Sequence, residues 1–363
     1  MKGNTMGYKH VKKNECDILS SKEWNDISLE VERLSAALAQ LGGCGGGGGS
    51  TQVQEAGLQN GWHNYGNTYN NAGFFKDSQG TVYLKGLVRS GNKNAIFTLP
   101  AGYRPAAREL FWTCTNPHKI GRVDVLPDGR ILPINVNNGW VSLDGLSFRS
   151  SKATGQEDWK AVGFQNGWRN YGASYNTGAF HKTKHGIVRL RGLVKSGNGN
   201  AIFTLPAGYR PDGRNLFLDC TNPNGAGRID VLPDGRVLPV RVHSGWASLD
   251  GLFFRASGAS GQEAWKATAF QNGWVNYKNS YNNGGYYKDR DGVVHLRGLV
   301  KSGNNHGIFT LPAGYRPAAR QLFGVCTHPN VGGRVDVLPD GRVIPISIHS
   351  GWVSLDGLSF RAA

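Results

Sequence analysis

Apolar and polar residues alternate over short stretches through most of this chain, and glycine, proline or asparagine separates the stretches. In "GRIDVLPDGRVLPVRV", residues 227–242, apolar residues alternate on both sides of Asp234–Gly235. An Asp-Gly pair between two such runs predicts a β-hairpin. "GIVRLRGLVKSGNGNAIFTLPAGYRP", residues 186–211, predicts two strands around an Asn/Gly loop. Its last residues predict a rigid turn in which Pro206 and Pro211 fix the backbone and Tyr209 covers an apolar edge.

Both stretches occur three times with a fixed offset. Trp62, Trp168 and Trp274 stand 106 residues apart, and the cysteines and aspartates of each copy keep the same spacing. A constant offset of this length predicts three copies of one folding unit, because solenoid repeats are much shorter, at roughly 20–50 residues. We place the units at 54–150, 158–256 and 264–363, with the short polar joints "SKATGQED" and "SGASGQEA" between them.

No stretch within a unit sustains helical periodicity. Each unit contains about seven or eight short predicted strands. The expected fold class is therefore mainly β, with three tandem antiparallel β-sandwich domains of a jelly-roll-like kind after a short N-terminal coiled-coil helix.

The helix is predicted over residues 20–41, where Ser20 and Glu23 form a capping-box pattern. Its apolar residues follow a heptad seam, which consists of Trp24, Ile27, Val31, Leu34, Leu38 and Leu41. A lone helix of this length is marginal in water, so the seam must be buried. Self-association, as a dimer or a trimer, and packing on the chain's own domains are the two ways to bury it. Residues 1–19 are expected to be an attachment peptide, and the glycine-rich residues 42–53 a flexible linker.

The net charge is +16, and all of the excess lies in the repeats, because residues 1–53 contain equal numbers of basic and acidic residues. A basic surface favours anionic partners such as acidic polysaccharide, and it equally serves to keep a protein soluble. Basic residues are scattered and do not form long runs, so no specific nucleic-acid partner is expected. The chain shows no signal peptide and no apolar run long enough to cross a bilayer, so membrane insertion is not expected either.

Each unit carries a single cysteine, which is expected to be a small buried side chain; these are Cys114, Cys220 and Cys326. Cys44 is expected either to form an interchain disulfide or to be a free thiol. No Cys/His cluster predicts a metal site, and no cofactor is expected.

Acid–base chemistry would need carboxylates or histidines in every unit. No histidine is repeated, and the repeated aspartates have structural explanations: Asp128 and its equivalents form hairpin turns, Asp144 and its equivalents lie in a "LDG" turn, and Asp124 lies near Arg122 and Arg130. We therefore predict no catalytic residue, although paired carboxylates also occur in glycosidases.

Sugar binding needs aromatic faces beside amide or basic groups. That mixture occurs in "NGWHNYGNTYN" and its two counterparts, where the tryptophan and the first tyrosine are alternatively core residues. The candidate glycan contacts are Tyr69, Tyr175, Tyr281, Asn64, Asn170 and Asn276.

The phrases "GIVRLRGLVKSGNGNAIFTLPAGYRP", "GRIDVLPDGRV" and "WASLDGLFFRA", with the N-terminal "DILSSKEWNDISLEVERL", resemble tail-fibre or receptor-binding proteins of tailed bacteriophages and related contractile injection systems. The resemblance covers nearly the whole chain. It implies a homotrimer, anchored through its N-terminal segment on a baseplate, tail or capsid protein. It also implies β-rich lobes that bind cell-surface glycans, and a location on a virion or extracellular particle assembled in the host cytoplasm.

The expected function is therefore a non-enzymatic fibre or spike subunit that attaches a particle to cell-surface glycans, with repetition multiplying weak contacts. Tandem copying also lengthens a spike, so a purely structural fibre or decoration protein is the alternative. A glycan depolymerase is the third hypothesis.

Overall fold

The computed structural model describes residues 52–363, except 137–138, 155, 243–244, 347 and 349–350. The described residues are mainly β, they contain no helix, and their strands pair antiparallel in six sheets. The mainly β class is thus confirmed. The predicted attachment peptide, coiled-coil helix and glycine linker, together with Cys44, lie outside the described residues.

The first repeat has a four-stranded sheet and a six-stranded sheet, ordered β1-β3-β4-β10 and β2-β5-β9-β6-β7-β8. Its strands are β1 (Gln54–Glu55), β2 (His63–Asn64), β3 (Gly73–Lys76), β4 (Thr81–Lys85), β5 (Leu87–Arg89), β6 (Glu109–Thr115), β7 (Lys119–Val125), β8 (Ile131–Ile134), β9 (Trp140–Ser142) and β10 (Ser147–Arg149).

The second repeat has the same plan with one more strand, in the order β11-β13-β14-β21 and β12-β15-β20-β17-β18-β19-β16. Its strands are β11 (Lys160–Ala161), β12 (Arg169–Asn170), β13 (Ala179–Lys182), β14 (Ile187–Arg191), β15 (Leu193–Lys195), β16 (Phe203–Thr204), β17 (Asn215–Thr221), β18 (Gly225–Val231), β19 (Arg236–Arg241), β20 (Trp246–Ser248) and β21 (Phe253–Arg255).

The third repeat copies the second, in the order β22-β24-β25-β32 and β23-β26-β31-β28-β29-β30-β27. Its strands are β22 (Lys266–Ala267), β23 (Val275–Asn276), β24 (Gly285–Lys288), β25 (Val293–Arg297), β26 (Leu299–Lys301), β27 (Phe309–Thr310), β28 (Gln321–Thr327), β29 (Val331–Val337), β30 (Arg342–Ile346), β31 (Trp352–Ser354) and β32 (Ser359–Arg361). Within the residues that the structure describes, the repeats thus have ten or eleven strands, more than expected, because two-residue strands leave no readable alternation in the sequence.

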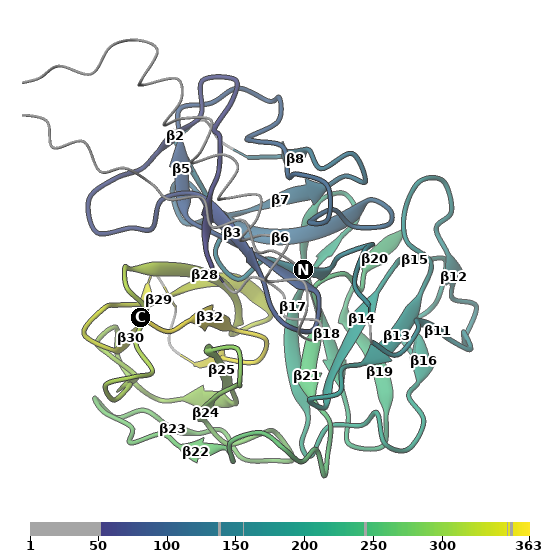
Figure 1. The fold of residues 1–363 in the computed structure, drawn as a ribbon. Helices are drawn as coiled ribbons and strands as arrows, with labels where there is room; N and C mark the ends of the chain where they lie inside the picture. The colour runs from purple at the N-terminus through teal and green to yellow at the C-terminus, as the bar shows by residue number, and fades with distance from the viewer. Residues whose placement is uncertain (1–51, 137–138, 155, 243–244, 347, 349–350) are drawn as a thin grey trace, which may run out of the picture. The chain divides into compact units, whose positions relative to one another are not determined.

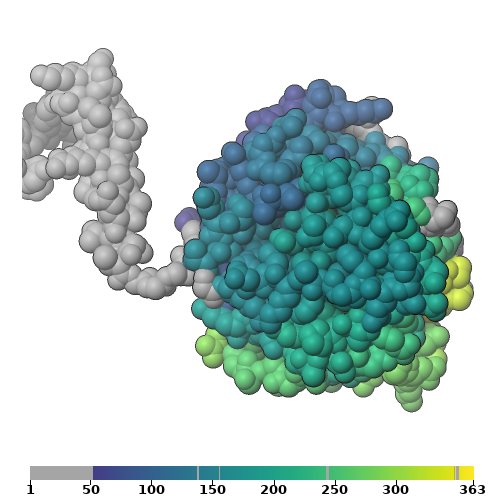
Figure 2. Space-filling view, turned by 90° about the vertical axis from the view of Figure 1, so that its right-hand side faces the viewer, coloured from purple at the N-terminus to yellow at the C-terminus, as the bar shows by residue number. Residues whose placement is uncertain are grey.

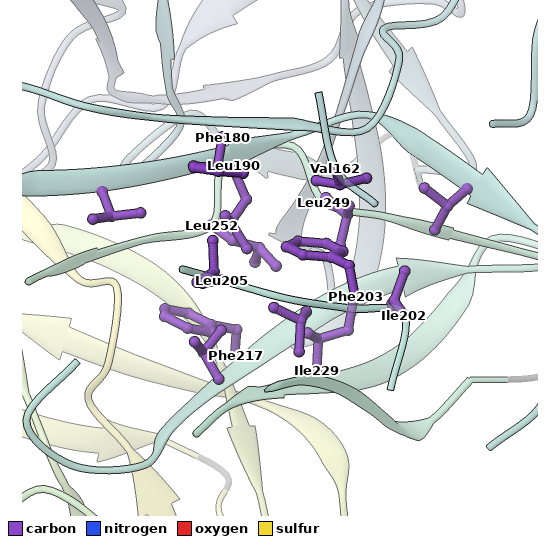
Figure 3. Close-up of a cluster of buried hydrophobic side chains, with 14 of the residues drawn as sticks. Val162, Phe180, Leu190, Ile202, Phe203, Leu205, Phe217, Ile229, Leu249 and Leu252 are labelled. Atoms are coloured by element: carbon purple, nitrogen blue, oxygen red, sulfur yellow. The ribbon is translucent and has the colours of Figure 1, made fainter. Parts of the chain in front are cut away.

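The core of each repeat lies between its two sheets. In the second repeat, Phe180 and Leu190 come from the four-stranded sheet, and Phe203, Phe217 and Ile229 come from the larger one (Figure 3). The first and third repeats have separate cores built from the equivalent residues. Two packed sheets around an apolar layer form a β-sandwich.

The two turns predicted from the sequence are present. Asp234–Gly235 closes the hairpin between β18 and β19, with Gly235 at a φ of 93°, where a glycine carries no steric cost. Tyr209 packs edge-on against Phe180, with ring centroids 5.0 Å apart, and so covers the margin of the core.

Each repeat has two distinct ends. In the first repeat, β4 and β5 are two halves of one bent strand that pairs along β10 and β9. We call the end with the β3–β4 turn, residues 77–80, the basal end; Gln54 pairs with Phe74, so the chain joins β1 from this end. We call the other end, where β5, β6 and β2 meet, the apical end.

The three repeats belong to one compact unit, residues 49–363, in which they surround a common centre (Figure 1). Strands β6, β17 and β28 contact one another at this centre, which we call the central axis. Figure 2 shows the surface of this ring from the side of the second repeat. The lobes thus lie side by side around an axis, and repetition does not lengthen the ring as a linear row of domains would.

Candidate functional site

Each repeat docks on the next through a buried aspartate that holds two arginines. Between the first and second repeats, Asp124 is fully buried and accepts hydrogen bonds from Arg108 Nε, at 2.6 Å, and from Arg122 Nε and Nη2, at 2.5 and 2.6 Å. Asp230 and Asp336 hold the equivalent arginines between the second and third repeats and between the third and first. Ion pairing was predicted for Asp124, but its partners are Arg122 and Arg108, whereas Arg130 pairs with Asp128.

The paired arginines reach across to aromatic side chains of the next repeat. Arg108 lies over the Tyr175 ring at 5.3 Å, and Arg122 lies over Trp246 at 5.5 Å and donates to Asn224 Oδ1 at 2.8 Å. The other two interfaces repeat these contacts with Tyr281, Trp352 and Asn330, and with Tyr69, Trp140 and His118. Charged groups that are both paired and stacked can lie buried without an unpaired charge.

A second aspartate ties the backbones of neighbouring repeats together. Asp250 accepts hydrogen bonds from Gly192 N in its own repeat, at 2.7 Å, and from Leu110 N in the first repeat, at 3.0 Å. Asp356 and Asp144 do the same for the other two interfaces. Burial raises the pKa of all three carboxyl groups to about 6. Since the last of these contacts joins the third repeat to the first, the ring is closed.

The predicted glycan-binding tyrosines lie in these interfaces. Tyr69, Tyr175 and Tyr281 are partly buried, and the stacked arginine from the preceding repeat lies over each ring. Tyr281 Oη also accepts a hydrogen bond from Arg228 Nη2 at 2.8 Å. These contacts give the tyrosines a role in ring closure, and their role as glycan contacts stays a prediction.

The predicted glycan-binding asparagines brace the loops of their own repeats. Asn64 Oδ1 accepts a hydrogen bond from Ala72 N, and Asn170 and Asn276 accept the equivalent bond from Gly178 and Gly284, all at 2.7 Å. Each asparagine stands five residues before its tyrosine in the sequence, but the asparagines stabilise the loop of one lobe, whereas the tyrosines contact the neighbouring lobe. Trp62, Trp168 and Trp274 are buried core residues, which was the alternative considered for them.

The apical end presents exposed loops of all three repeats. In the first repeat, its loops contain exposed Asn60, His63, Lys93 and Asn94, together with the hairpin tip after β6, where His118 is exposed. The tips "NPH", "NPN" and "HPN" that differ among repeats thus belong to this end, and the differing "FKDSQG", "HKTKHG" and "YKDRDG" turns belong to the basal end.

The central axis is lined by residues that differ among the repeats. Trp112, Leu218 and Gly324 occupy the same position of β6, β17 and β28 and border one cavity of about 90 Å³. A side chain on Gly324 would stand 3.3 Å from Trp112 Nε1, so the tryptophan occupies room that the glycine leaves. Ile120 and Gly332 form a second complementary pair of this kind.

A cavity of about 440 Å³ lies at the basal end of the second repeat. Glu157, Lys182, Lys184 and the loop 256–260 line it. Glu157 accepts a hydrogen bond from Tyr209 Oη at 2.6 Å, and Lys182 Nζ donates to Gly208 O at 2.8 Å. Glu157 and Lys182 are therefore engaged in fixing the loops around the cavity.

The three repeat cysteines are free and buried, as predicted, and burial raises the pKa of Cys114 to about 12. Among the described residues, no group of three or more His, Cys, Asp and Glu side chains is arranged to hold a metal ion. A search of the same residues found no helix that could span a bilayer.

The docking residues Arg108, Arg122 and Leu110 were not predicted. Strand β6, "ELFWTCT", is buried on both faces, and such a strand carries a nearly continuous apolar run. That run was the available signal for a second packed face. Comparisons of the chain with protein-family models, with curated proteins and with solved structures found no match.

Proposed function

We propose that this chain is a fibre or spike subunit that attaches a phage or a contractile injection particle to cell-surface glycans. The observation that carries the proposal is the closed ring, which holds three copies of the exposed apical loops at the end opposite to the one where the chain joins β1. Weak contacts at equivalent loops add up when several engage one surface together, with gains of about 10²–10⁴ in apparent affinity.

The residues before the ring supply the other half of the proposal. The heptad seam of residues 20–41 assembles three chains, and residues 1–19 attach the trimer to a baseplate, tail or capsid protein. Each of the three rings is a set of three jelly-roll-like lobes. The trimer then carries nine lobes on glycine-rich tethers, and each tether lets its ring adjust to the surface.

The repeated aspartates support a binding role over an enzymatic one. Asp124, Asp144 and their equivalents are buried and saturated with arginine or backbone N–H donors, and Asp128 is bound to Arg130 in a turn. A glycosidase needs two carboxyl groups that face a substrate. We therefore keep the depolymerase as the third hypothesis, behind a purely structural fibre.

The test uses the full chain, fluorescently labelled, on a panel of bacterial and eukaryotic cells with and without periodate treatment. We expect binding to some cell types that is lost when periodate destroys their glycans and that persists in moderate salt. Binding that disappears with salt on every cell type would contradict the proposal and favour a structural fibre. Release of reducing sugar from the same cells would show a depolymerase instead.

A further inference from the structure

Three short edge strands carry a position of the apical end at which the residue differs among the repeats. Strands β2, β12 and β23 each pair with the end of the bent strand, so that His63 lies opposite Arg89, Arg169 opposite Lys195, and Val275 opposite Lys301. Residues directly opposite in an antiparallel pair have their side chains on the same face. The second repeat thus places two cations side by side, where the third places one beside an apolar residue.

The cation pair of the second repeat has no acidic partner in the part of the chain that the structure describes. Arg169 is exposed, and neither it nor Lys195 forms an ion pair with a described residue. By contrast, Arg108, Arg122 and their equivalents are all paired with buried aspartates. Like charges directly opposite on two strands destabilise their pairing, so this arrangement costs stability in the free protein.

The pair stands at the margin of the interface between the first and second repeats. Lys195 Nζ lies 4.7 Å from the centre of the Tyr171 ring, and Lys195 pairs with Trp246 on the next strand. Tyr171 and Trp246 belong to an apolar cluster that also contains Leu110 of the first repeat, and Arg122 of the first repeat stacks on the same tryptophan. The interface margin therefore combines aromatic groups with two cations that form no ion pair with a described residue.

We propose that Arg169 and Lys195 bind an anionic group of a cell-surface glycan, a carboxylate or a phosphate. This inference rests on the proposed function and specifies its ligand class. An anion between the two side chains would remove their mutual repulsion and accept charge-assisted hydrogen bonds from both. The equivalent interface margins of the other repeats bind the same group less tightly, and the one with Val275 binds it most weakly.

The repeats themselves supply the variants for a test. Arg169→Val copies the third repeat into the second, and Val275→Arg makes the reverse change. Both positions are exposed on two-residue edge strands, with Val275 46% exposed, and valine and arginine each occur there naturally. The control is Lys184→Val, which removes one exposed positive charge at the basal end.

The probes are immobilised polygalacturonate, a glycerol-phosphate polymer and dextran, with the full chain as the ligand in solution. Binding of the wild type to one acidic polymer and not the other identifies the anion as carboxylate or phosphate. We expect Arg169→Val to weaken binding to that polymer by about tenfold, the loss of one charge-assisted hydrogen bond, and Val275→Arg to strengthen it. Lys184→Val should leave binding unchanged, and dextran should not distinguish the proteins.

Two results would overturn the assignment. Equal losses for Arg169→Val and Lys184→Val would show attraction by overall charge without a site. Periodate-sensitive binding to cells together with no binding to either acidic polymer would overturn this inference and leave the proposed function intact. Absence of any glycan-dependent cell binding by the wild type would instead contradict the proposed function itself. Cooperative thermal unfolding of each variant close to the melting temperature of the wild type verifies that the fold is retained, since the change in like-charge repulsion shifts that temperature only slightly.

Discussion

The interfaces between the repeats and the central axis around which the repeats meet follow opposite rules. At each interface the same kinds of residue occur three times, with an aspartate between two arginines and a second aspartate on a backbone N–H. At the axis, equivalent positions differ, with tryptophan, leucine and glycine at residues 112, 218 and 324. The interfaces thus reuse one set of charged contacts, whereas the axis combines three different side chains around one volume.

The difference has a physical reason. Hydrogen-bonded charges at an interface require a fixed geometry, so each interface has the same arrangement of one aspartate and two arginines. A central axis is a shared volume in which the total size of the side chains matters, and one large residue can be offset by one absent side chain. Two experiments would break or sharpen this comparison, and a third concerns a buried histidine of the second repeat.

The largest effect is expected from Asp230→Asn at the interface between the second and third repeats. The substitution leaves Arg214 and Arg228 without their anion in a buried place, and the free energy of unfolding should fall by about 3 kcal/mol or more. Denaturant unfolding of the full chain measures this loss in the free energy of unfolding. Asp234→Asn, which removes a half-exposed partner of Arg236, is the control and should cost less than about 1 kcal/mol. Equal effects of the two substitutions would show that the interface charges do not hold the ring together.

The second experiment exchanges two residues of the axis. Trp112→Gly opens a void and Gly324→Trp overfills the axis, so each alone should destabilise the chain by about 1–3 kcal/mol. The double variant restores one tryptophan and one glycine, and it should recover part of the loss, with a coupling of about 1–3 kcal/mol in a double-mutant cycle. Strict additivity of the two losses would mean that these residues do not share one volume.

The smallest effect is expected from His181. This side chain is buried, and neither of its ring nitrogens has a hydrogen-bond partner among the described residues. The equivalent residues of the other repeats are Phe75 and Tyr287. Burial, and then the charges of Arg149, Arg189 and Arg191, lower the pKa of His181 to about 3. Because the unfolded chain binds a proton near pH 6.5 and the folded chain does not, this residue costs stability as the pH falls below that value.

His181→Phe should therefore stabilise the protein by about 2 kcal/mol more at pH 5 than at pH 7. Melting temperatures of the wild type and the variant at the two pH values test this. His63→Phe, which replaces an exposed histidine by the same residue, is the matched control. A gain independent of pH would indicate a packing effect alone.

The sequence was sufficient for the parts of the fold that depend on local pattern. The 106-residue period, the Asp234–Gly235 hairpin, the Tyr209 turn and the buried cysteines all follow from residues close together in the chain. The ring could not be predicted in this way, because its contacts join positions such as Asp250 and Leu110, which are 140 residues apart. Nothing in the local alternation distinguishes a strand face that covers a core from one that covers a neighbour.

The candidate site shows the same limit. The sequence identified tyrosines and asparagines in one loop. In the structure, the tyrosines contact an arginine of the neighbouring repeat, and the asparagines accept hydrogen bonds from the backbone of their own loop. Arg169 was passed over because its significance depends on Lys195, which lies opposite only after the strands pair. Charge patterns along the chain therefore could not reveal the cation pair.

Ring closure within one chain also changes how the assembly responds to dilution. Three separate lobes would dissociate at low concentration, whereas lobes on one chain meet at an effective concentration set by their short connections. The three lobes of one chain would therefore stay assembled at any dilution.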